Sequence, residues 1–277
     1  MQKKLLSAVI WLTDLKKRGD KVHISAYAAK GAFFILLSAV PLITLTIGIS
    51  GVIFPLESIM MEKWFVSALS GDIKNILVML LTQIQAIKGV SVISVSSVLV
   101  VWSATRGIRS IAKGIGVIYG AEKGGIVAAT IRPVVYTFFM LAALGLSFVV
   151  LVLASPLEKL ITVLLGAKGG VLMLVLNMRN IIFFLLLWLL FSFAYSFLGQ
   201  SDIPFKAQLL GGALASAGWI VYSFGYSVYI KYFSSLSAFY GGFGTVMLFM
   251  VWLYMCMHIL LWGAVINRIK WQKRQEL

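Results

Sequence analysis

Six strongly apolar segments, none of which contains an Asp or Glu, constrain this chain more than any other feature. A helix that crosses a bilayer needs roughly 20 mostly apolar residues. Backbone polar groups cannot be left unpaired in lipid, so such segments must become helices. The sequence therefore predicts six membrane-spanning helices. They are residues 24–54, 90–104, 134–154, 181–198, 207–229 and 243–266.

The composition excludes an ordinary water-soluble fold. Of the 277 residues, 61% are hydrophobic and 12% are charged, whereas a soluble domain is about half apolar and about a quarter charged. Two connecting segments, 72–87 and 156–176, are expected to form amphipathic helices at the outer interface, the first because its apolar residues recur at helical spacing. We therefore predict an all-α polytopic membrane protein, with six transmembrane helices and amphipathic interfacial helices.

The sequence predicts that the chain is divided into three regions. Residues 1–23 are expected to form a cytoplasmic amphipathic arm, residues 24–267 the six-helix transmembrane domain, and residues 268–277 a basic cytoplasmic tail.

The distribution of basic residues predicts the orientation. The chain carries 24 Lys and Arg against 9 Asp and Glu, a net charge of +15. Sixteen basic residues fall on the side of the termini, seven fall on the opposite side, and Lys30 lies within the first span. Lys and Arg collect in cytoplasmic loops, so both termini are expected in the cytoplasm. In a soluble protein this charge would suggest nucleic acid, but here membrane topology and anionic lipid explain it, and no nucleic-acid partner is expected.

A basic strip continues the second predicted span. Arg106, Arg109 and Lys113 are spaced i, i+3 and i+7, so they share one helical face. Together with Lys30 they are candidates for binding an anionic headgroup. The alternative is that they fix topology, with long side chains that reach the interface.

A second candidate is a cavity lined by Pro41, Tyr222, Tyr226 and Tyr229. The three tyrosines recur along one face of the fifth span, and a proline inside the first span kinks or weakens that helix. Hydrogen bonds between helices and an interfacial aromatic belt explain the same tyrosines without a cavity. The glycine-rich segment 240–244 predicts a flexible turn before the last helix.

Hydrolytic metal chemistry lacks candidate ligands. The chain has one cysteine, Cys256, and two histidines, His23 and His258, which lie far apart in sequence. Hydrolytic metal sites need several His and carboxylate ligands at close spacing. We predict no metal, no cofactor and no catalytic residue. Direct use of ATP is not expected, since no GxxxxGK[ST] motif is present.

Several short motifs are distributed over nearly the whole chain. They are Ala26-Tyr27-Ala28-Ala29, 38–41, Trp102-Ser103-Ala104, Gly107-Ile108, Pro204, Gly212-Ala213, Trp219, Tyr229, 240–244, Trp252-Leu253-Tyr254, Gly263-Ala264 and Asn267. In their order and spacing these motifs resemble the YihY/BrkB family of bacterial inner-membrane proteins.

The resemblance implies a multi-pass protein of the bacterial cytoplasmic membrane. The family has carried two labels, virulence factor and the tRNA-processing ribonuclease BN. The lack of metal ligands and of a soluble catalytic domain speaks against ribonuclease activity here. The chain also departs from the family pattern, because Val265 stands where many members have a glutamate.

Two functions fit these observations. The first is a transporter or flippase for an anionic lipid or envelope precursor, and the alternative is a non-transporting scaffold for envelope assembly. In both cases we expect no enzyme activity. The expected partners are membrane lipids, especially anionic ones, and the sequence is compatible with an oligomer.

The basic asymmetry makes the topology testable. Reporter fusions at residue 277 and near Asp72 should report a cytoplasmic C-terminus and an external first loop, because sixteen basic residues flank one side and seven the other. An external C-terminus would contradict both the orientation and the number of spans.

Overall fold

All regular secondary structure that the computed structural model describes is α-helical, which confirms the all-α part of the predicted fold class. The predicted interfacial helices and most of the N-terminal arm lie outside the described residues. The described residues are 19–20, 22–53, 90–121, 125, 129–143, 145, 179–233 and 235–276.

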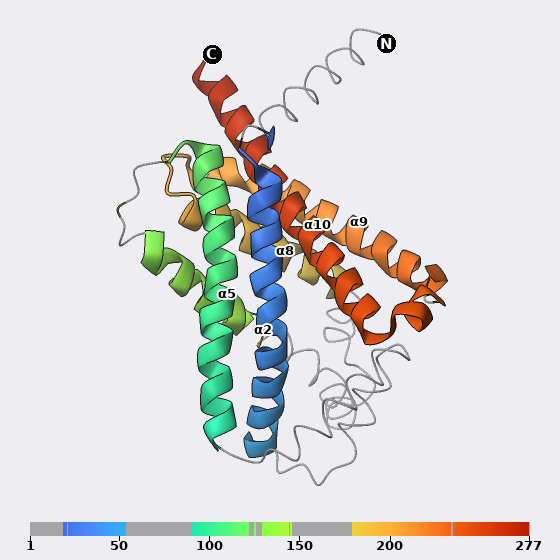
Figure 1. The fold of residues 1–277 in the computed structure, drawn as a ribbon. Coiled ribbons are helices and arrows are strands. Elements are labelled where there is room, and N and C mark those ends of the chain that lie inside the picture. The colour runs from blue at the N-terminus through green and yellow to red at the C-terminus, as the bar shows by residue number, and fades with distance from the viewer. Residues whose placement is uncertain are drawn as a thin grey trace, which may run out of the picture.

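Each described helix overlaps a predicted span (Figure 1). Three helices contain stretches long and apolar enough to cross a membrane, Ile24–Leu45, Phe205–Tyr232 and Phe243–Gln275. The count of six spans remains a prediction. The helices are α2 (Ile24–Ile53), α5 (Val90–Tyr119), an unlabelled helix Ala129–Ala143, α8 (Arg179–Leu198), α9 (Phe205–Phe233) and α10 (Ser235–Gln275).

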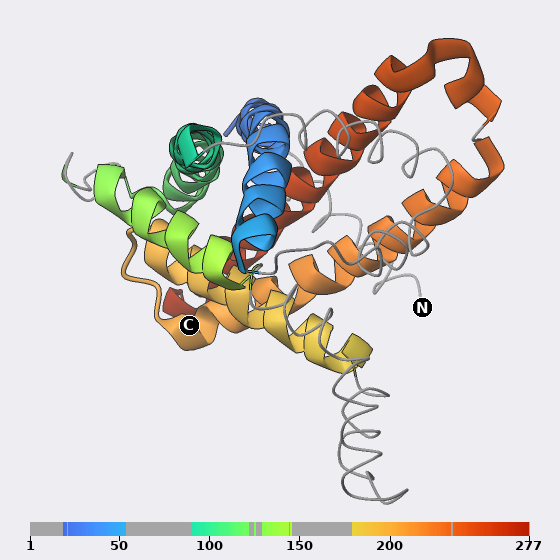
Figure 2. The same ribbon diagram turned by 90° about the horizontal axis from the view of Figure 1, so that it is seen from below.

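The predicted turn at 240–244 is wrong. These residues lie within α10, which begins at Ser235 and continues for 41 residues, and the ribbon bends near this end (Figure 2). A glycine inside a helix costs about 1 kcal/mol relative to alanine, which continued backbone hydrogen bonding can offset. Where water is scarce, an unpaired backbone group costs more than the glycine does.

Helices α2 and α5 form an antiparallel pair. The backbones approach closely where Gly31 of α2 packs against Gly107 and Ile111 of α5. Near one end of the contact, the Ser110 hydroxyl donates to the Tyr27 carbonyl over 3.0 Å. Small residues and a hydroxyl that reaches a neighbouring backbone are typical of helix pairs in membranes.

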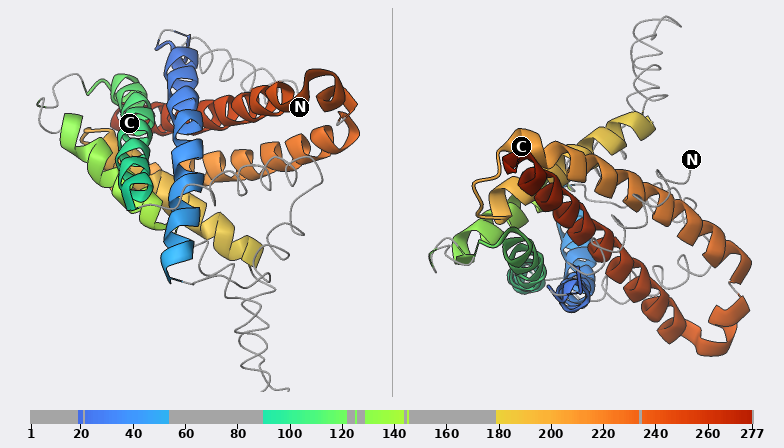
Figure 3. Two further views of the ribbon diagram at one scale, coloured as in Figure 1. Left: turned by 60° about the horizontal axis from the view of Figure 1, so that its bottom comes forward. Right: turned by 90° about the horizontal axis from the view of Figure 1, so that it is seen from above.

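Helices α9 and α10 form a second antiparallel pair, and α8 packs against α9. Gly211 of α9 lies against the Gly263 carbonyl of α10 so closely that no β-carbon fits. The Tyr195 hydroxyl of α8 donates to the Leu260 carbonyl over 2.7 Å and ties α8 to α10. Figures 2 and 3 show α9 and α10 extending together past the other described helices.

The four residues Tyr119, Gln208, Gly211 and Asn267, here called the Asn267 junction, join three helices through buried hydrogen bonds. The Asn267 amide nitrogen donates to the carbonyl and to the side-chain Oε1 of Gln208, each over 3.1 Å. Its Oδ1 accepts the Gly211 backbone N–H at 2.7 Å. The Tyr119 hydroxyl donates to Gln208 Oε1 at 2.5 Å. Because buried polar groups are costly when unpaired, these bonds fix how α5, α9 and α10 meet.

The end of α5 places Tyr119 at this junction. Gly120 adopts a left-handed backbone with φ of 69°, and the N–H groups of Gly120 and Ala121 bond back to Val117 and Gly116. This is a Schellman cap, in which glycine is favoured. Burial raises the pKa of the Tyr119 phenol, so it stays protonated as a donor.

Gly211 and Gly225, both in α9, offer a matched test of the helix contact. Gly211→Ala should lower the free energy of unfolding by about 1–3 kcal/mol, because overpacking forces α9 and α10 apart. Gly225 has open space around its position, so Gly225→Ala should be neutral or stabilise the helix by up to about 1 kcal/mol. Thermal unfolding of both variants in detergent measures the difference. Equal melting temperatures would contradict the close contact.

Candidate functional site

The C-terminal half of α5 carries the predicted basic strip, and its first member is held by aromatic rings. The Arg106 guanidinium carbon lies 4.6 Å from the Trp102 ring centre and 5.7 Å from that of Phe34. These distances are in the range of cation–π contacts. Since Phe34 belongs to α2, the contact positions Arg106 over the seam between the two helices.

The other members of the strip have no counter-charge among the described residues. Arg109 is half-buried, and its Nε atom is buried without a hydrogen-bond acceptor in that part of the chain. Lys113 is exposed one turn further on. No ion pair with a described carboxylate involves Arg106, Arg109 or Lys113. The strip thus presents cations that a bound anion could satisfy.

Lys30 lies on α2 at the level of the basic strip. It is exposed and directly precedes Gly31, which packs against Gly107 of α5. It also lies one helical turn before Phe34, whose ring is beneath Arg106. The structure therefore brings Lys30 to the same end of the helix pair as the α5 cations.

The exposed sides of α2 and α5 grade from cations through aromatic rings to aliphatic side chains. We call this surface the graded face. Because the helices are antiparallel, both gradients run in the same spatial direction. The α2 members are Lys30, Phe33, Phe34, Leu37 and Val40, and the α5 members are Lys113, Arg109, Arg106, Trp102, Leu99, Val98 and Val95. Such a surface matches an amphiphile with an anionic head and apolar tails.

The residues of the predicted tyrosine cavity lie on two separate helices, α9 and α2. Tyr222, Tyr226 and Tyr229 of α9 stack in a row, with successive ring centres 6.0 and 6.4 Å apart. The Tyr226 hydroxyl is buried and has no hydrogen-bond partner among the described residues. Pro41 is half-buried in α2, a separate helix, and no described ring contact or hydrogen bond links it to the tyrosines.

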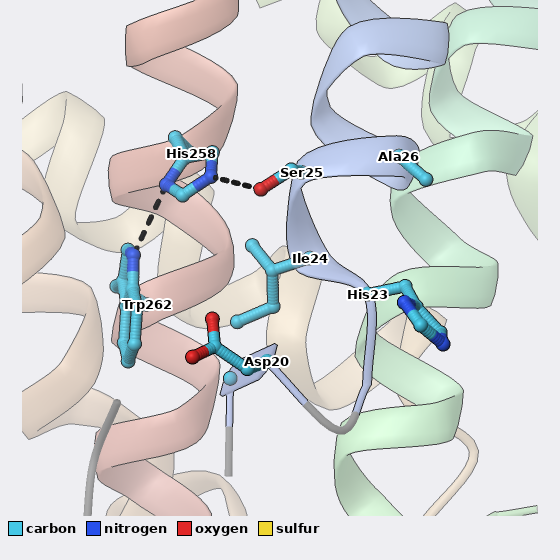
Figure 4. A pocket seen from close by; sticks show the side chains of 8 residues that line it. Asp20, His23, Ile24, Ser25, Ala26, His258 and Trp262 are labelled. Atoms are coloured by element: carbon cyan, nitrogen blue, oxygen red, sulfur yellow. Dashed lines mark hydrogen bonds between the residues drawn. The ribbon is translucent and has the colours of Figure 1, made fainter. Parts of the chain in front are cut away.

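Both histidines of the chain line one cavity, although they lie far apart in sequence (Figure 4). It has a volume of about 280 Å³ and lies between the start of α2 and α10. Trp262 and His258, four residues apart on α10, form one hydrogen bond of its wall. The four-residue spacing of His258 and Trp262 is visible in the sequence and indicates that the two side chains can meet on one helix face. No sequence pattern indicates that the start of α2 forms the other side of the cavity. The lining residues are Gly19, Asp20, His23, Ile24, Ser25, Ala26, His258 and Trp262.

No group of three His, Cys, Asp or Glu side chains in the described part of the chain is placed to hold a metal ion. Cys256 is buried in α10.

These long apolar helices, which expose large hydrophobic side chains on their surfaces, define a helical membrane protein. The family model described as Virulence factor BrkB matches residues 15–276, so the chain belongs to this family.

The similar curated proteins are described as membrane proteins or by a ribonuclease label. A UPF0761 membrane protein of Methylibium petroleiphilum is 29% identical over 267 residues, which are 92% of this chain and 62% of that protein. The ribonuclease-like protein YfkH of Bacillus subtilis is 24% identical over 177 residues, 64% of each chain. A UPF0761 membrane protein of Nitrosospira multiformis is 33% identical over 76 residues, 27% of this chain and 18% of that protein. Each match thus covers less than two thirds of the relative's length. No solved structure matches the chain significantly.

Proposed function

We propose that the graded face binds an anionic lipid or envelope precursor, and that the protein moves this amphiphile as a transporter or flippase. The observation that carries the proposal is the shared direction of two gradients, from cations to aliphatic side chains, on antiparallel helices. A lipid has the same polarity along its length, so one molecule would satisfy both helices at once.

The chemistry of the cations favours a phosphate-bearing headgroup. A guanidinium can pair a phosphate through two parallel hydrogen bonds, which an ammonium group cannot do. Arg106 is already oriented by Trp102 and Phe34, so less side-chain entropy is lost on binding. The Arg109 Nε, buried without an acceptor among the described residues, would gain one.

The orientation of the protein in the membrane determines the leaflet at which the cations of the graded face lie. A multi-pass protein of the bacterial cytoplasmic membrane, with both termini in the cytoplasm, would place the graded face's cations at the inner leaflet. Its partners would then be membrane lipids, particularly anionic ones, with no nucleic acid involved.

A non-transporting scaffold for envelope assembly is the second candidate. The graded face is an open surface rather than an enclosed path, and this favours the scaffold. In that case Arg106, Arg109 and Lys113 fix topology and hold boundary lipids, without moving a substrate.

We infer no ribonuclease activity, in spite of the name that one relative carries. Hydrolytic metal sites use several His and carboxylate ligands together. The described residues supply no such group, and the whole chain has two histidines.

A charge-matched pair of double variants tests lipid binding. Arg106→Ala with Arg109→Ala should weaken retention of phosphatidylglycerol by roughly 30-fold, since each cation near a membrane surface contributes about 1 kcal/mol. Lys273→Ala with Arg274→Ala removes the same charge from the exposed end of α10 and should change retention little. Native mass spectrometry of the purified proteins measures bound lipid. Equal retention in the two double variants would reduce the strip to a topology marker.

Arg109→Lys refines the same test, because it keeps the charge and removes the bidentate geometry. Preference for phosphatidylglycerol over phosphatidylcholine should fall, while membrane insertion is unchanged. An unaltered preference would contradict a specific phosphate contact by Arg109.

A further inference from the structure

His258 lies in the sixth predicted span and bridges α10 to α2. The Trp262 indole Nε1–H donates to His258 Nδ1 over 3.0 Å. On the other side of the ring, Nε2 lies 3.1 Å from the Ser25 hydroxyl oxygen. Figure 4 shows both bonds at the wall of the cavity. Both ring nitrogens are therefore engaged, one on the same helix and one across the helix contact.

These partners determine the tautomer of the imidazole. An indole nitrogen is a donor only, so the Nδ1 that faces it must be the unprotonated nitrogen. The proton of neutral His258 then lies on Nε2, which donates to the Ser25 hydroxyl. This arrangement is compatible with the neutral ring alone.

Protonation would break the arrangement at one defined bond. Imidazolium carries a proton on both nitrogens, so Nδ1–H would oppose Nε1–H of Trp262. Neither group can accept, and one side chain must move. The Ser25 bond can persist because Nε2 remains a donor.

An alternative acceptor lies in the same cavity. The charged or titratable side chains that share the lining with His258 are Asp20 and His23, both from the segment before α2, and α5 and α9 contribute none to this lining. On α10 itself, the Tyr254 ring centre lies 5.3 Å from that of His258. The Asp20 carboxylate points toward Trp262, whereas the His23 ring points away from His258 (Figure 4). Asp20 is thus the anion available to a protonated Nδ1.

We propose that His258 is a proton-binding site, at which protonation exchanges the bond to Trp262 within α10 for an interaction with Asp20, and so adds a contact between α10 and the segment that precedes α2. The proton enters from the cavity and returns to it, and no other reactant is needed. Asp20 lies four residues before the start of α2, the helix that carries Lys30 and Phe34 of the graded face. The use of the proton as the coupling ion for lipid movement rests on the proposed function, whereas the proton site itself does not.

Within the six predicted spans, His258 is the candidate for the group that couples proton binding to transport. Intramembrane proton relays use Asp, Glu and His. The six predicted spans contain no Asp or Glu, and His258 is their one histidine. A proton-coupled mechanism within these spans would therefore depend on this side chain.

Nuclear magnetic resonance of labelled histidine tests the proton site directly. His23→Asn leaves His258 as the single histidine, and asparagine tolerates the positive φ of 54° found at position 23. At neutral pH the ring should show the Nε2–H tautomer. Between about pH 8 and pH 5 its protonation should coincide with a shift of the Trp262 indole N–H signal. The Nδ1–H tautomer at neutral pH, or an indole signal that ignores the titration, would overturn the proposal.

A matched pair of tryptophan variants provides the second arm. Trp262→Phe keeps a ring but removes the donor to Nδ1, so His258 should become protonated at a pH higher by about half a unit to one unit. Trp271→Phe, on the same helix and outside the cavity lining, should leave the titration unchanged. Identical titrations in the two variants would overturn the Trp262 bond as the controlling contact.

Coupling is measured separately, by movement of a fluorescent phosphatidylglycerol in proteoliposomes. The wild-type rate should depend on pH, and His258→Gln should remove that dependence. A pH-independent wild-type rate would overturn coupling while leaving the resonance result intact. No lipid movement at any pH would contradict the transport function instead, so the two failures are distinguishable.

Discussion

The side-chain amide of Asn267 is the point on which the arrangement of the helices depends. It is almost fully buried and bonds both to Gln208 and to the backbone of Gly211. A buried amide without partners would cost about 1–3 kcal/mol. The Asn267 amide nitrogen also lies 3.5 Å from the Tyr119 hydroxyl oxygen of α5. The close approach of α9 and α10 at Gly211, and the capped end of α5 at Tyr119, are both conditions for satisfying this one side chain.

The other helices are positioned relative to the Asn267 junction. The capped α5 runs back along α2 as an antiparallel partner, and their shared seam positions Arg106 over Phe34 and Trp102. The same α2 meets α10 through Ser25 and His258. The graded face on α2 and α5 and the histidine cavity between α2 and α10 therefore share helix α2.

Part of this could be predicted from the sequence, because helices and helix faces are local properties. The predicted span 181–198 nearly coincides with α8, and the i, i+3, i+7 spacing placed Arg106, Arg109 and Lys113 along one side of α5. Contacts between helices were not predictable in this way. The spacing cannot reveal that Phe34 supports Arg106, or that Ser25 meets a histidine 233 residues away.

The glycines at 241 and 242 show a different limit. They predicted a turn because glycine is frequent in turns, yet the surroundings favour continued backbone hydrogen bonding and the helix persists.

The central claim is that the graded face, rather than apolar surface in general, holds an anionic lipid. Photo-crosslinking in nanodiscs tests it most directly, with a photoactivatable phosphatidylglycerol and a phosphatidylcholine probe of the same chain length. The phosphatidylglycerol probe should label the segment around Leu99 and Trp102 more strongly than the phosphatidylcholine probe does. The two probes should label the exposed α9 residues Val221 and Phe224 equally. Equal labelling of both surfaces by both probes would contradict the account.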